Sequence, residues 1–383
     1  MKFSTRNKLY SQVLPVLLAL TVTFSGGADK KKPAKADKPA KHFSLKLEYD
    51  ELKIGPNSIL AIALPHTAGS GKTQIVAGCF ESGEVALYEQ SKHKLNKVRT
   101  IGKVNGGITD IKLISMDGGH NKVAVANDNK GTIRIFDLKN DVEPIVLFNG
   151  PHGIDHMEIA DFNNDGLGDI IATGVAGQTK VWFENVDNKK FVKRNLPIVF
   201  KSVSAVHVMD FDQDGDTDML MASDYLKTIS LLTNDGKGNF IKSGIIGGVS
   251  GILDIDALDI DMDGDQDVVY TSYKEKRVQL LVNQQDGFER KNLSTKMHSL
   301  NNVEVFDLGN DGRPDLVISS YDDNAVRIIE NSAAGLFEHQ FQTDIPAPSD
   351  IEVRTDRSNN TTKFYISSLV KNKIFTVDVA LSE

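Results

Sequence analysis

The chain has 383 residues, of which 40% are hydrophobic and 25% charged, and these values exclude a wholly disordered, collagen-like or multispanning membrane protein. Its single cysteine, Cys79, cannot form an internal disulfide and is too few for a cysteine-based zinc or iron–sulfur site. The formal charge of −8 is uneven, because residues 1–41 carry +7 and residues 42–383 therefore carry −15. An acidic body of this kind is poorly suited to binding nucleic-acid phosphates and well suited to binding cations.

The N-terminus has the pattern of an export signal. Lys2, Arg6 and Lys8 precede the apolar run VLPVLLALTVTF at residues 13–24, and the small residues 25–28 follow. The run is shorter than the roughly 20 residues of a membrane span. We therefore expect residues 1–28 to be a signal peptide cleaved near residues 25–28, with an uncleaved anchor as the alternative. The prediction is an exported protein of bacterial type that is periplasmic, on the cell surface or secreted, with no transmembrane span after cleavage.

A lysine-rich segment follows. Residues 29–41 read DKKKPAKADKPAK and offer almost nothing to bury, so we expect a disordered linker. Two interpretations stay open for it: a solvated spacer, or a contact with anionic lipid or polymer.

From residue 42 onward the chain consists of short strands in repeats. After an isolated strand at residues 42–50, HFSLKLEYD, an apolar burst begins after residues 74, 122, 169, 218, 267, 315 and 363, at intervals of 47 to 49 residues. Each of the seven repeats contains runs that alternate apolar and polar residues, separated by turns rich in Gly, Asn and Asp. Four strands in about 48 residues correspond to one blade of a β-propeller.

The two ends of the repeat region complement each other. The last repeat stops after its third strand, and the strand at residues 42–50 precedes the first repeat. If that strand completes the last blade, the ring closes and no sheet edge stays open there. We therefore predict an all-β fold, a seven-bladed β-propeller of four-stranded blades over residues 42–383, in which the N-terminal strand closes the last blade.

Four repeats share a nine-residue acidic loop between their first two strands: DFNNDGLGD (161–169), DFDQDGDTD (210–218), DIDMDGDQD (259–267) and DLGNDGRPD (307–315). Positions 1, 3, 5 and 9 carry oxygen side chains, position 7 can offer a backbone carbonyl, and the glycine at position 6 permits a sharp turn. Carboxylates this crowded require a cation, and Ca²⁺ accepts six to eight oxygen ligands. The predicted metal ligands are Asp161, Asn163, Asp165, Leu167 and Asp169; Asp210, Asp212, Asp214, Asp216 and Asp218; Asp259, Asp261, Asp263, Asp265 and Asp267; and Asp307, Asp311, Arg313 and Asp315.

Two other interpretations of these loops were considered. An EF-hand requires Glu at position 12, where this chain has Ala172, Met221, Tyr270 and Ile318, so that interpretation is excluded. Metal-free β-turns rich in Asp and Gly do not predict a fourfold repetition of the ligand positions. This second interpretation stays open chiefly for the loop at Asp307, where Gly309 removes the ligand at position 3. We therefore predict three to four Ca²⁺ sites.

The Asp-x-Asp-x-Asp-Gly-x-x-Asp motif resembles that of the FG-GAP/VCBS repeat family, the calcium-loop propellers that also form the integrin α-subunit head. Two loops fit the motif fully, Asn163 is an ordinary substitution, and Gly309 is a departure. The resemblance covers nearly the whole mature chain and implies calcium between the first two strands of a blade. It also implies that partners engage the opposite face or a separate domain. Blades 1, 2 and 7 lack the motif, so we assign them no metal.

The first strands of the blades carry polar residues that are expected to face the central channel. One row is Asp110, His156, Asp254, Asn302 and Asp350, and a second row two residues further on is Lys112, Glu158, His207, Asp256, Glu304 and Glu352. The first row is a possible site for a cation, a sugar or a basic peptide. The alternative is that these residues are polar because water fills the channel.

Two functions follow as hypotheses. The first is an exported, calcium-binding and monomeric propeller that acts as a protein-binding, glycan-binding or scaffold module, with mainly structural calcium, no catalysis and no nucleic-acid partner. The second is an enzyme resembling polysaccharide lyases or lactonases that uses the channel face. The sequence contains no HExxH or GxSxG segment to support a metalloprotease or a serine nucleophile.

Overall fold

The structure is a computed structural model. It describes residues 43–44, 52–53, 59–65, 73–91, 94–116, 119–128, 131–150, 152–174, 179–196, 202–284, 286–293, 297–308, 310–341, 345–356, 361–371 and 373–381. Within these residues the regular elements are all β-strands, and none of the described chain forms a helix that could span a membrane. The predicted signal peptide at residues 1–28 and the linker at residues 29–41 lie outside the described residues.

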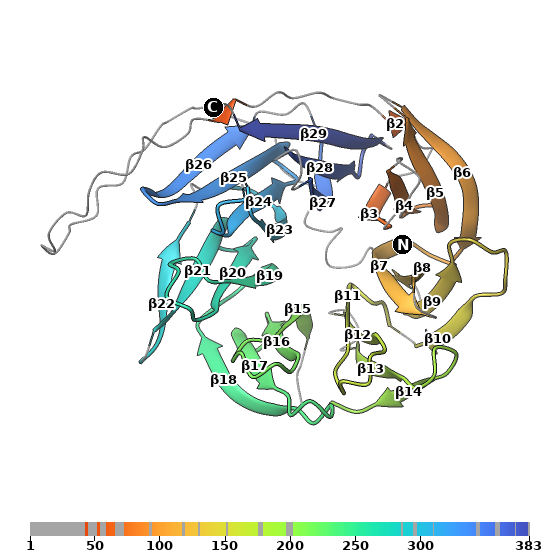
Figure 1. The fold of residues 1–383 in the computed structure, drawn as a ribbon, viewed down its shortest axis with the longest axis horizontal. Helices are drawn as coiled ribbons and strands as arrows, with labels where there is room; N and C mark the ends of the chain where they lie inside the picture. Colours follow the sequence, from red (N-terminus) through yellow and green to blue (C-terminus); the bar gives the residue numbers. More distant parts are fainter. Residues whose placement is uncertain are drawn as a thin grey trace, which may run out of the picture.

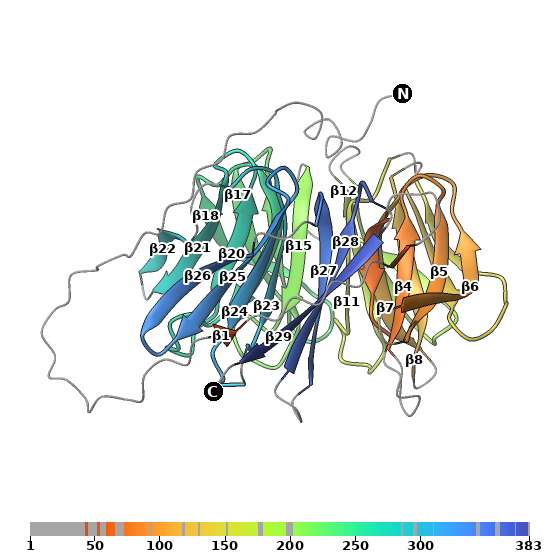
Figure 2. The same cartoon turned by 90° about the horizontal axis from the view of Figure 1, so that it is seen from above.

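Seven antiparallel sheets stand around a central axis like the blades of a propeller (Figure 1). Seen from the side, the ring is a disc whose strands run between its two faces (Figure 2). In each blade consecutive strands are hydrogen-bonded neighbours, and the first strand of each blade contacts the first strand of the next. The predicted all-β, seven-bladed propeller with four-stranded blades is confirmed.

The first three blades have these strands: in blade 1, β3 (Ile59–Ala63), β4 (Gln74–Cys79), β5 (Glu84–Ser91) and β6 (Lys94–Lys103); in blade 2, β7 (Ile108–Met116), β8 (Gly119–Asn127), β9 (Thr132–Asp137) and β10 (Ile145–Asn149); in blade 3, β11 (His156–Ala160), β12 (Asp169–Gly174), β13 (Thr179–Asn185) and β14 (Phe191–Arg194). The next three have these: in blade 4, β15 (Val203–Met209), β16 (Asp218–Ser223), β17 (Thr228–Thr233) and β18 (Ile241–Gly247); in blade 5, β19 (Ile252–Leu258), β20 (Asp267–Ser272), β21 (Arg277–Gln284) and β22 (Gly287–Asn292); in blade 6, β23 (Leu300–Phe306), β24 (Asp315–Ser320), β25 (Ala325–Ser332) and β26 (Gly335–Phe341).

Blade 7 is closed by the N-terminal part of the chain. It contains β27 (Pro348–Asp356), β28 (Thr361–Ser368) and β29 (Lys373–Leu381), and both β1 (Phe43–Ser44) and β2 (Leu52–Lys53) pair with the outer edge of β29. Phe43 lies opposite Leu381, and Leu52 lies opposite Ile374, so the N-terminal segment runs antiparallel to β29 at both ends. This confirms the predicted closing strand and extends the pairing beyond Asp50 to residues 52–53.

The hydrophobic core lies between neighbouring blades. The second strand of blades 3 to 6 is buried along its whole length because other strands of its sheet flank it and neighbouring blades cover its two faces. The join between the last and first blades is equally apolar, with Tyr365 and Ile374 packed in one cluster with Ile59 and Ile75. At about 1.5 to 3 kcal/mol for each fully buried large apolar side chain, these clusters hold the ring closed.

Candidate metal centres and the central channel

The four acidic loops lie at one end of blades 3 to 6, where the first strand turns into the second. Position 9 of each loop is the first residue of the second strand, namely Asp169 of β12, Asp218 of β16, Asp267 of β20 and Asp315 of β24. The four loops therefore lie on one face of the ring. The turns between second and third strands, such as residues 224–227, lie at the other end of the blades.

Two positions in each loop have backbone dihedral angles in the left-handed region, where φ is positive. Position 4 has φ between 52° and 63° in Asn164, Gln213, Met262 and Asn310, and the glycine at position 6 has φ between 83° and 99°. No atom lies within 4 Å of the point where a Cβ of Gly215 or Gly264 would stand, so space does not exclude a side chain there. The backbone angle is what requires glycine, because side-chain-bearing residues rarely adopt it.

The carboxylates at positions 1 and 5 fold the loop back on itself. In blade 5, Asp259 accepts hydrogen bonds from the backbone N–H groups of Asp263 at 3.1 Å and Gly264 at 3.0 Å. Asp263 in turn accepts one from Asp265 at 2.9 Å. The position 6 to 1 and position 7 to 5 bonds recur in all four loops. The motif thus encodes one loop shape four times.

The aspartate at position 9 is almost completely buried and joins three parts of its blade. In blade 5, Asp267 accepts the backbone N–H of Ile260 at 2.9 Å and of Asn283 at 2.7 Å. Corresponding pairs of bonds occur at Asp169, Asp218 and Asp315. The second donor in each blade is an asparagine 16 residues further on, and sequence analysis missed it although its spacing is constant: Asn185, Asn234, Asn283 and Asn331.

Burial shifts the titration of these aspartates. It raises the pKa of Asp169 and Asp315 to about 7 and that of Asp267 to about 6, against the opposing effect of the backbone N–H groups. The pKa of Asp261 at position 3 is also raised, by burial and then by the charges of Asp263 and Asp259. Each ionised loop therefore accumulates negative charge that a bound cation would stabilise.

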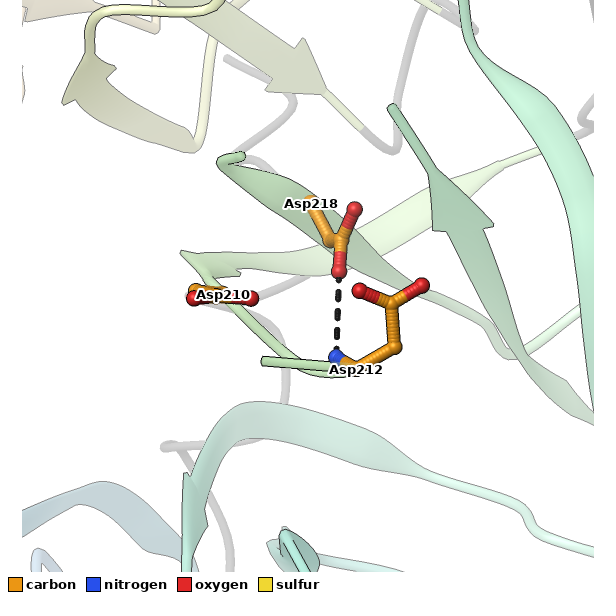
Figure 3. Close-up of side chains that lie close together, drawn as sticks. All are labelled: Asp210, Asp212 and Asp218. Atoms are coloured by element: carbon orange, nitrogen blue, oxygen red, sulfur yellow. Dashed lines mark hydrogen bonds between the residues drawn. The ribbon is translucent and has the colours of Figure 1, made fainter. Parts of the chain in front are cut away.

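The structure brings together positions 1, 3 and 9 of the two complete loops. The carboxylate oxygens of Asp210, Asp212 and Asp218 in blade 4 lie within 4.8 Å of one another, and Figure 3 shows the three side chains around one gap. The same holds for the equivalent group in blade 5: Asp259, Asp261 and Asp267. These two groups do not include position 5, where Asp214 and Asp263 each accept the N–H of position 7.

An unpaired oxygen supports a metal in blade 4. Oδ1 of Asp210 is buried and has no hydrogen-bond partner among the described residues, whereas Oδ2 accepts the N–H of Gly215 at 3.0 Å. A buried carboxylate oxygen without a partner is costly. A hard cation held by three converging carboxylates would satisfy it, so the residues present fit Ca²⁺.

The loops of blades 3 and 6 are less complete. In blade 3 the Oδ1 of Asn163 faces the N–H of Asp165 at 3.2 Å, and its amide group donates to Asp165 and to Glu184. In blade 6, Asp307 and Asp311 adopt the same bonds as in the other loops, while Gly309 lies outside the described residues. The backbone carbonyls of the position 7 residues stay predicted ligands, and the N–H of each donates to position 5 of its loop: Leu167, Asp216, Asp265 and Arg313.

A cavity of about 200 Å³ in the central channel is lined by all five residues of the first predicted row: Asp110, His156, Asp254, Asn302 and Asp350. Three of them link adjacent blades. Oδ2 of Asp110 accepts the backbone N–H of Met157 in blade 3 at 2.7 Å, and Asp254 accepts that of Val303 in blade 6 at 3.0 Å. Asp350 accepts that of Ile62 at 2.8 Å, which joins blade 7 to blade 1. These carboxylates therefore have a structural role in the ring.

The second row makes the channel strongly acidic. Lys112 lies 3.4 Å from Glu158, and this charge raises the pKa of the lysine well above its usual value. His207 lies 3.1 Å from Asp256. Burial raises the pKa of Glu304 well above normal and that of Glu352 to about 8, in the latter case with a further contribution from Asp350.

The raised pKa of Glu352 predicts a pH-dependent loss of stability. Between about pH 4.5, where the unfolded glutamate titrates, and pH 8, the folded protein holds this proton more tightly, so the free energy of unfolding falls as pH rises. In excess calcium, urea unfolding of Glu352→Gln should match wild type near pH 5 and be more stable by about 1 kcal/mol or more at pH 9. The exposed Glu289→Gln is the control and should show no such divergence; equal pH profiles for Glu352→Gln and wild type would contradict the prediction.

Comparison with known proteins agrees with the geometry. Residues 210–270 and 259–318, which contain the loops of blades 4, 5 and 6, match the FG-GAP-like repeat family. The fold is similar to the β-propeller domain of Cps50 (Swd1) from Myceliophteria thermophila, with a TM-score of 0.59 and 12% sequence identity over 88% of this chain and 100% of that one. No curated protein matches the sequence. The likeness to Cps50 concerns the fold alone.

Proposed function

We propose that this propeller, whose residues 210–318 carry FG-GAP-like repeats, is an exported calcium-stabilised module that binds a protein or glycan partner. The observation that carries the calcium role is the buried and unpaired Oδ1 of Asp210 beside the converging carboxylates of Asp212 and Asp218. When bound, Ca²⁺ would neutralise each loop and connect the first two strands of its blade. Three to four such ions would make the metal mainly structural.

The face opposite the calcium loops is the proposed partner surface. In the turn between β16 and β17, Tyr225 is 65% exposed and Leu226 is 41% exposed. Val370, in the turn between β28 and β29, is 53% exposed at the same end of blade 7. Exposed tyrosine and aliphatic side chains on a rigid ring suit recognition of a protein or of a sugar ring.

No specific observation favours the predicted alternative, which is catalysis in the channel. Asp254 and Asp350 use an oxygen each on the backbone of the next blade, as does Asp110. The acidic groups that converge enough to hold a metal, within the described residues, are those of the loops. The contacts of these channel residues therefore support a structural role for them.

The partner surface can be tested by capture from native envelope extracts with the full mature chain as bait. We expect a partner that is retained in calcium, lost in EGTA, and lost when Tyr225→Ser and Leu226→Ser are combined. The control is Ile241→Ser on the outer strand β18, where the side chain is 67% exposed but lies away from the proposed surface, and it should retain the partner. Retention by the Tyr225/Leu226 variant would place the partner elsewhere.

A further inference from the structure

We propose that the calcium loops of blades 3 to 6 are coupled to one another by hydrogen bonds between neighbouring loops, so that calcium binds to them with positive cooperativity. The inference rests on the calcium role proposed above and concerns how the sites act together.

Side chains at position 4 connect neighbouring loops directly. Nδ2 of Asn164 in blade 3 donates to Oδ1 of Asp216 in blade 4 at 2.6 Å. Asp216 is position 7, the residue whose backbone carbonyl is a predicted ligand. In the next pair, the amide of Gln213 in blade 4 donates to the carbonyl of Gly264, the residue before position 7 of blade 5. A residue that is not a ligand in one loop therefore contacts the side chain of position 7 or the carbonyl of position 6 in the next loop.

A second connection runs through the asparagine at the C-terminal end of the third strand. In blade 4 the N–H of Asn234 donates to Asp218 at 2.9 Å, while its Nδ2 donates to the carbonyl of Phe162 in the blade 3 loop at 2.8 Å. The N–H of Phe162 donates in turn to Asp169. The position 9 aspartates of blades 3 and 4 are thus joined by a continuous series of hydrogen bonds.

Blades 5 and 6 repeat this second connection. Asn331 donates its N–H to Asp315 at 2.7 Å and its Nδ2 to the carbonyl of Ile260 at 2.7 Å, and Ile260 donates to Asp267 at 2.9 Å. Together the contacts link the four loops in one row, from blade 3 to blade 6. Met262, at position 4 of blade 5, has no polar side chain with which to make the direct contact.

A turn of blade 4 lies against the first of these contacts. A Cβ on Gly236, in the turn between β17 and β18, would lie 2.5 Å from Oδ1 of Asp216 and 2.7 Å from Nδ2 of Asn164. The backbone of this turn therefore closes directly over the Asn164–Asp216 pair. Because the turn contacts both partners, we expect ordering of one loop to constrain the next.

The sign of the coupling distinguishes this arrangement from simple electrostatics. Two bound Ca²⁺ ions repel each other, so charge alone would make a neighbouring ion weaken binding. If the first ion orders the backbone of the neighbouring loop, the second ion binds a loop whose ordering cost has already been met, and its affinity increases. Coupling of this kind typically changes affinity by about 5-fold to 150-fold.

The chain contains a spectroscopic probe beside the blade 3 site. Its single tryptophan, Trp182, lies with Nε1 3.4 Å from Oδ2 of Asp169, the position 9 aspartate of blade 3. Terbium, which replaces calcium at oxygen sites, should therefore show luminescence sensitised by Trp182 when the blade 3 loop is filled. Excitation at the red edge of tryptophan absorption avoids the tyrosines.

The experiment is a double-mutant cycle on the full mature chain, titrated with terbium. Asp212→Ala, which removes the position 3 ligand of the neighbouring blade 4 site, should raise the terbium Kd read from the tryptophan-sensitised signal about fivefold or more in the native background. In an Asn164→Leu background, which is neutral in charge and removes no ligand, the same change should cost about twofold or less. The control background is Met262→Leu, where the full effect should persist.

The outcomes separate the two proposals. An equal effect of Asp212→Ala in the native and Asn164→Leu backgrounds would overturn the coupling while leaving terbium binding, and hence the proposed calcium role, intact. Tighter terbium binding in Asp212→Ala would overturn it too, because that result is the one repulsion predicts. A complete absence of sensitised terbium binding that calcium can displace would overturn both proposals.

Discussion

Removal of calcium should lower the melting temperature of this protein by roughly 10 °C. An ion that binds only the folded state at 100 times its Kd adds about 2.7 kcal/mol per site. Three sites therefore add about 8 kcal/mol, and the unfolding entropy of a ring of this size converts that into the stated shift. The measurement is thermal unfolding followed by far-ultraviolet circular dichroism in excess calcium, in EGTA, and after calcium is restored.

The blade 5 loop offers a matched pair of variants for this experiment. Asp261→Ala removes a side chain of the converging group and should reduce the calcium-dependent increase in melting temperature by about a third. Asp286→Ala makes the same change at an exposed residue outside the loops and should leave the increase unchanged. Identical melting curves of the wild type with and without calcium would rule out structural calcium.

The repeat spacing made the ring predictable because each blade contributes the same hydrophobic pattern. Apolar bursts at intervals of 47 to 49 residues locate the second strands, which are the most buried, and the acidic motif locates the turn that precedes them. The side-chain pattern also identified the channel lining correctly, since polar residues such as Asp110 and Asp254 alternate with apolar ones along the first strands.

The contacts between neighbouring blades could not be predicted from the sequence. That Asp110, Asp254 and Asp350 bond the backbone of the following blade depends on the offset between neighbouring inner strands, and no local pattern encodes that offset. The roles of Asn234 and Asn331 could not be predicted for another reason. Asparagine is common in turns, so its recurrence at the end of the third strand indicates a turn and no partner in another blade, although Asn234 and Asn331 each connect two blades.

The calcium loop itself combines two roles that one pair of substitutions can separate. Asp267 is buried and accepts the N–H groups of Ile260 and Asn283, whereas Asp261 is exposed and belongs to the converging carboxylates. In metal-free protein at pH 7, Asp267→Ala should lower the free energy of unfolding by about 2 kcal/mol, because two backbone N–H groups lose their acceptor. The cost of ionising buried Asp267, whose pKa is about 6, offsets part of that loss.

Urea unfolding without metal measures the structural role, and the change on adding calcium measures the ligand role. Asp261→Ala should leave the metal-free stability within about 0.5 kcal/mol of wild type, since it changes an exposed position. Asp267→Asn keeps one acceptor oxygen and should fall between Asp267→Ala and wild type. In calcium, Asp261→Ala and Asp267→Ala should both lose the increment of one site. If Asp267→Ala were as stable as Asp261→Ala without metal, the position 9 aspartate would be a ligand alone, and the hydrogen bonds that join its strands would contribute nothing to the fold.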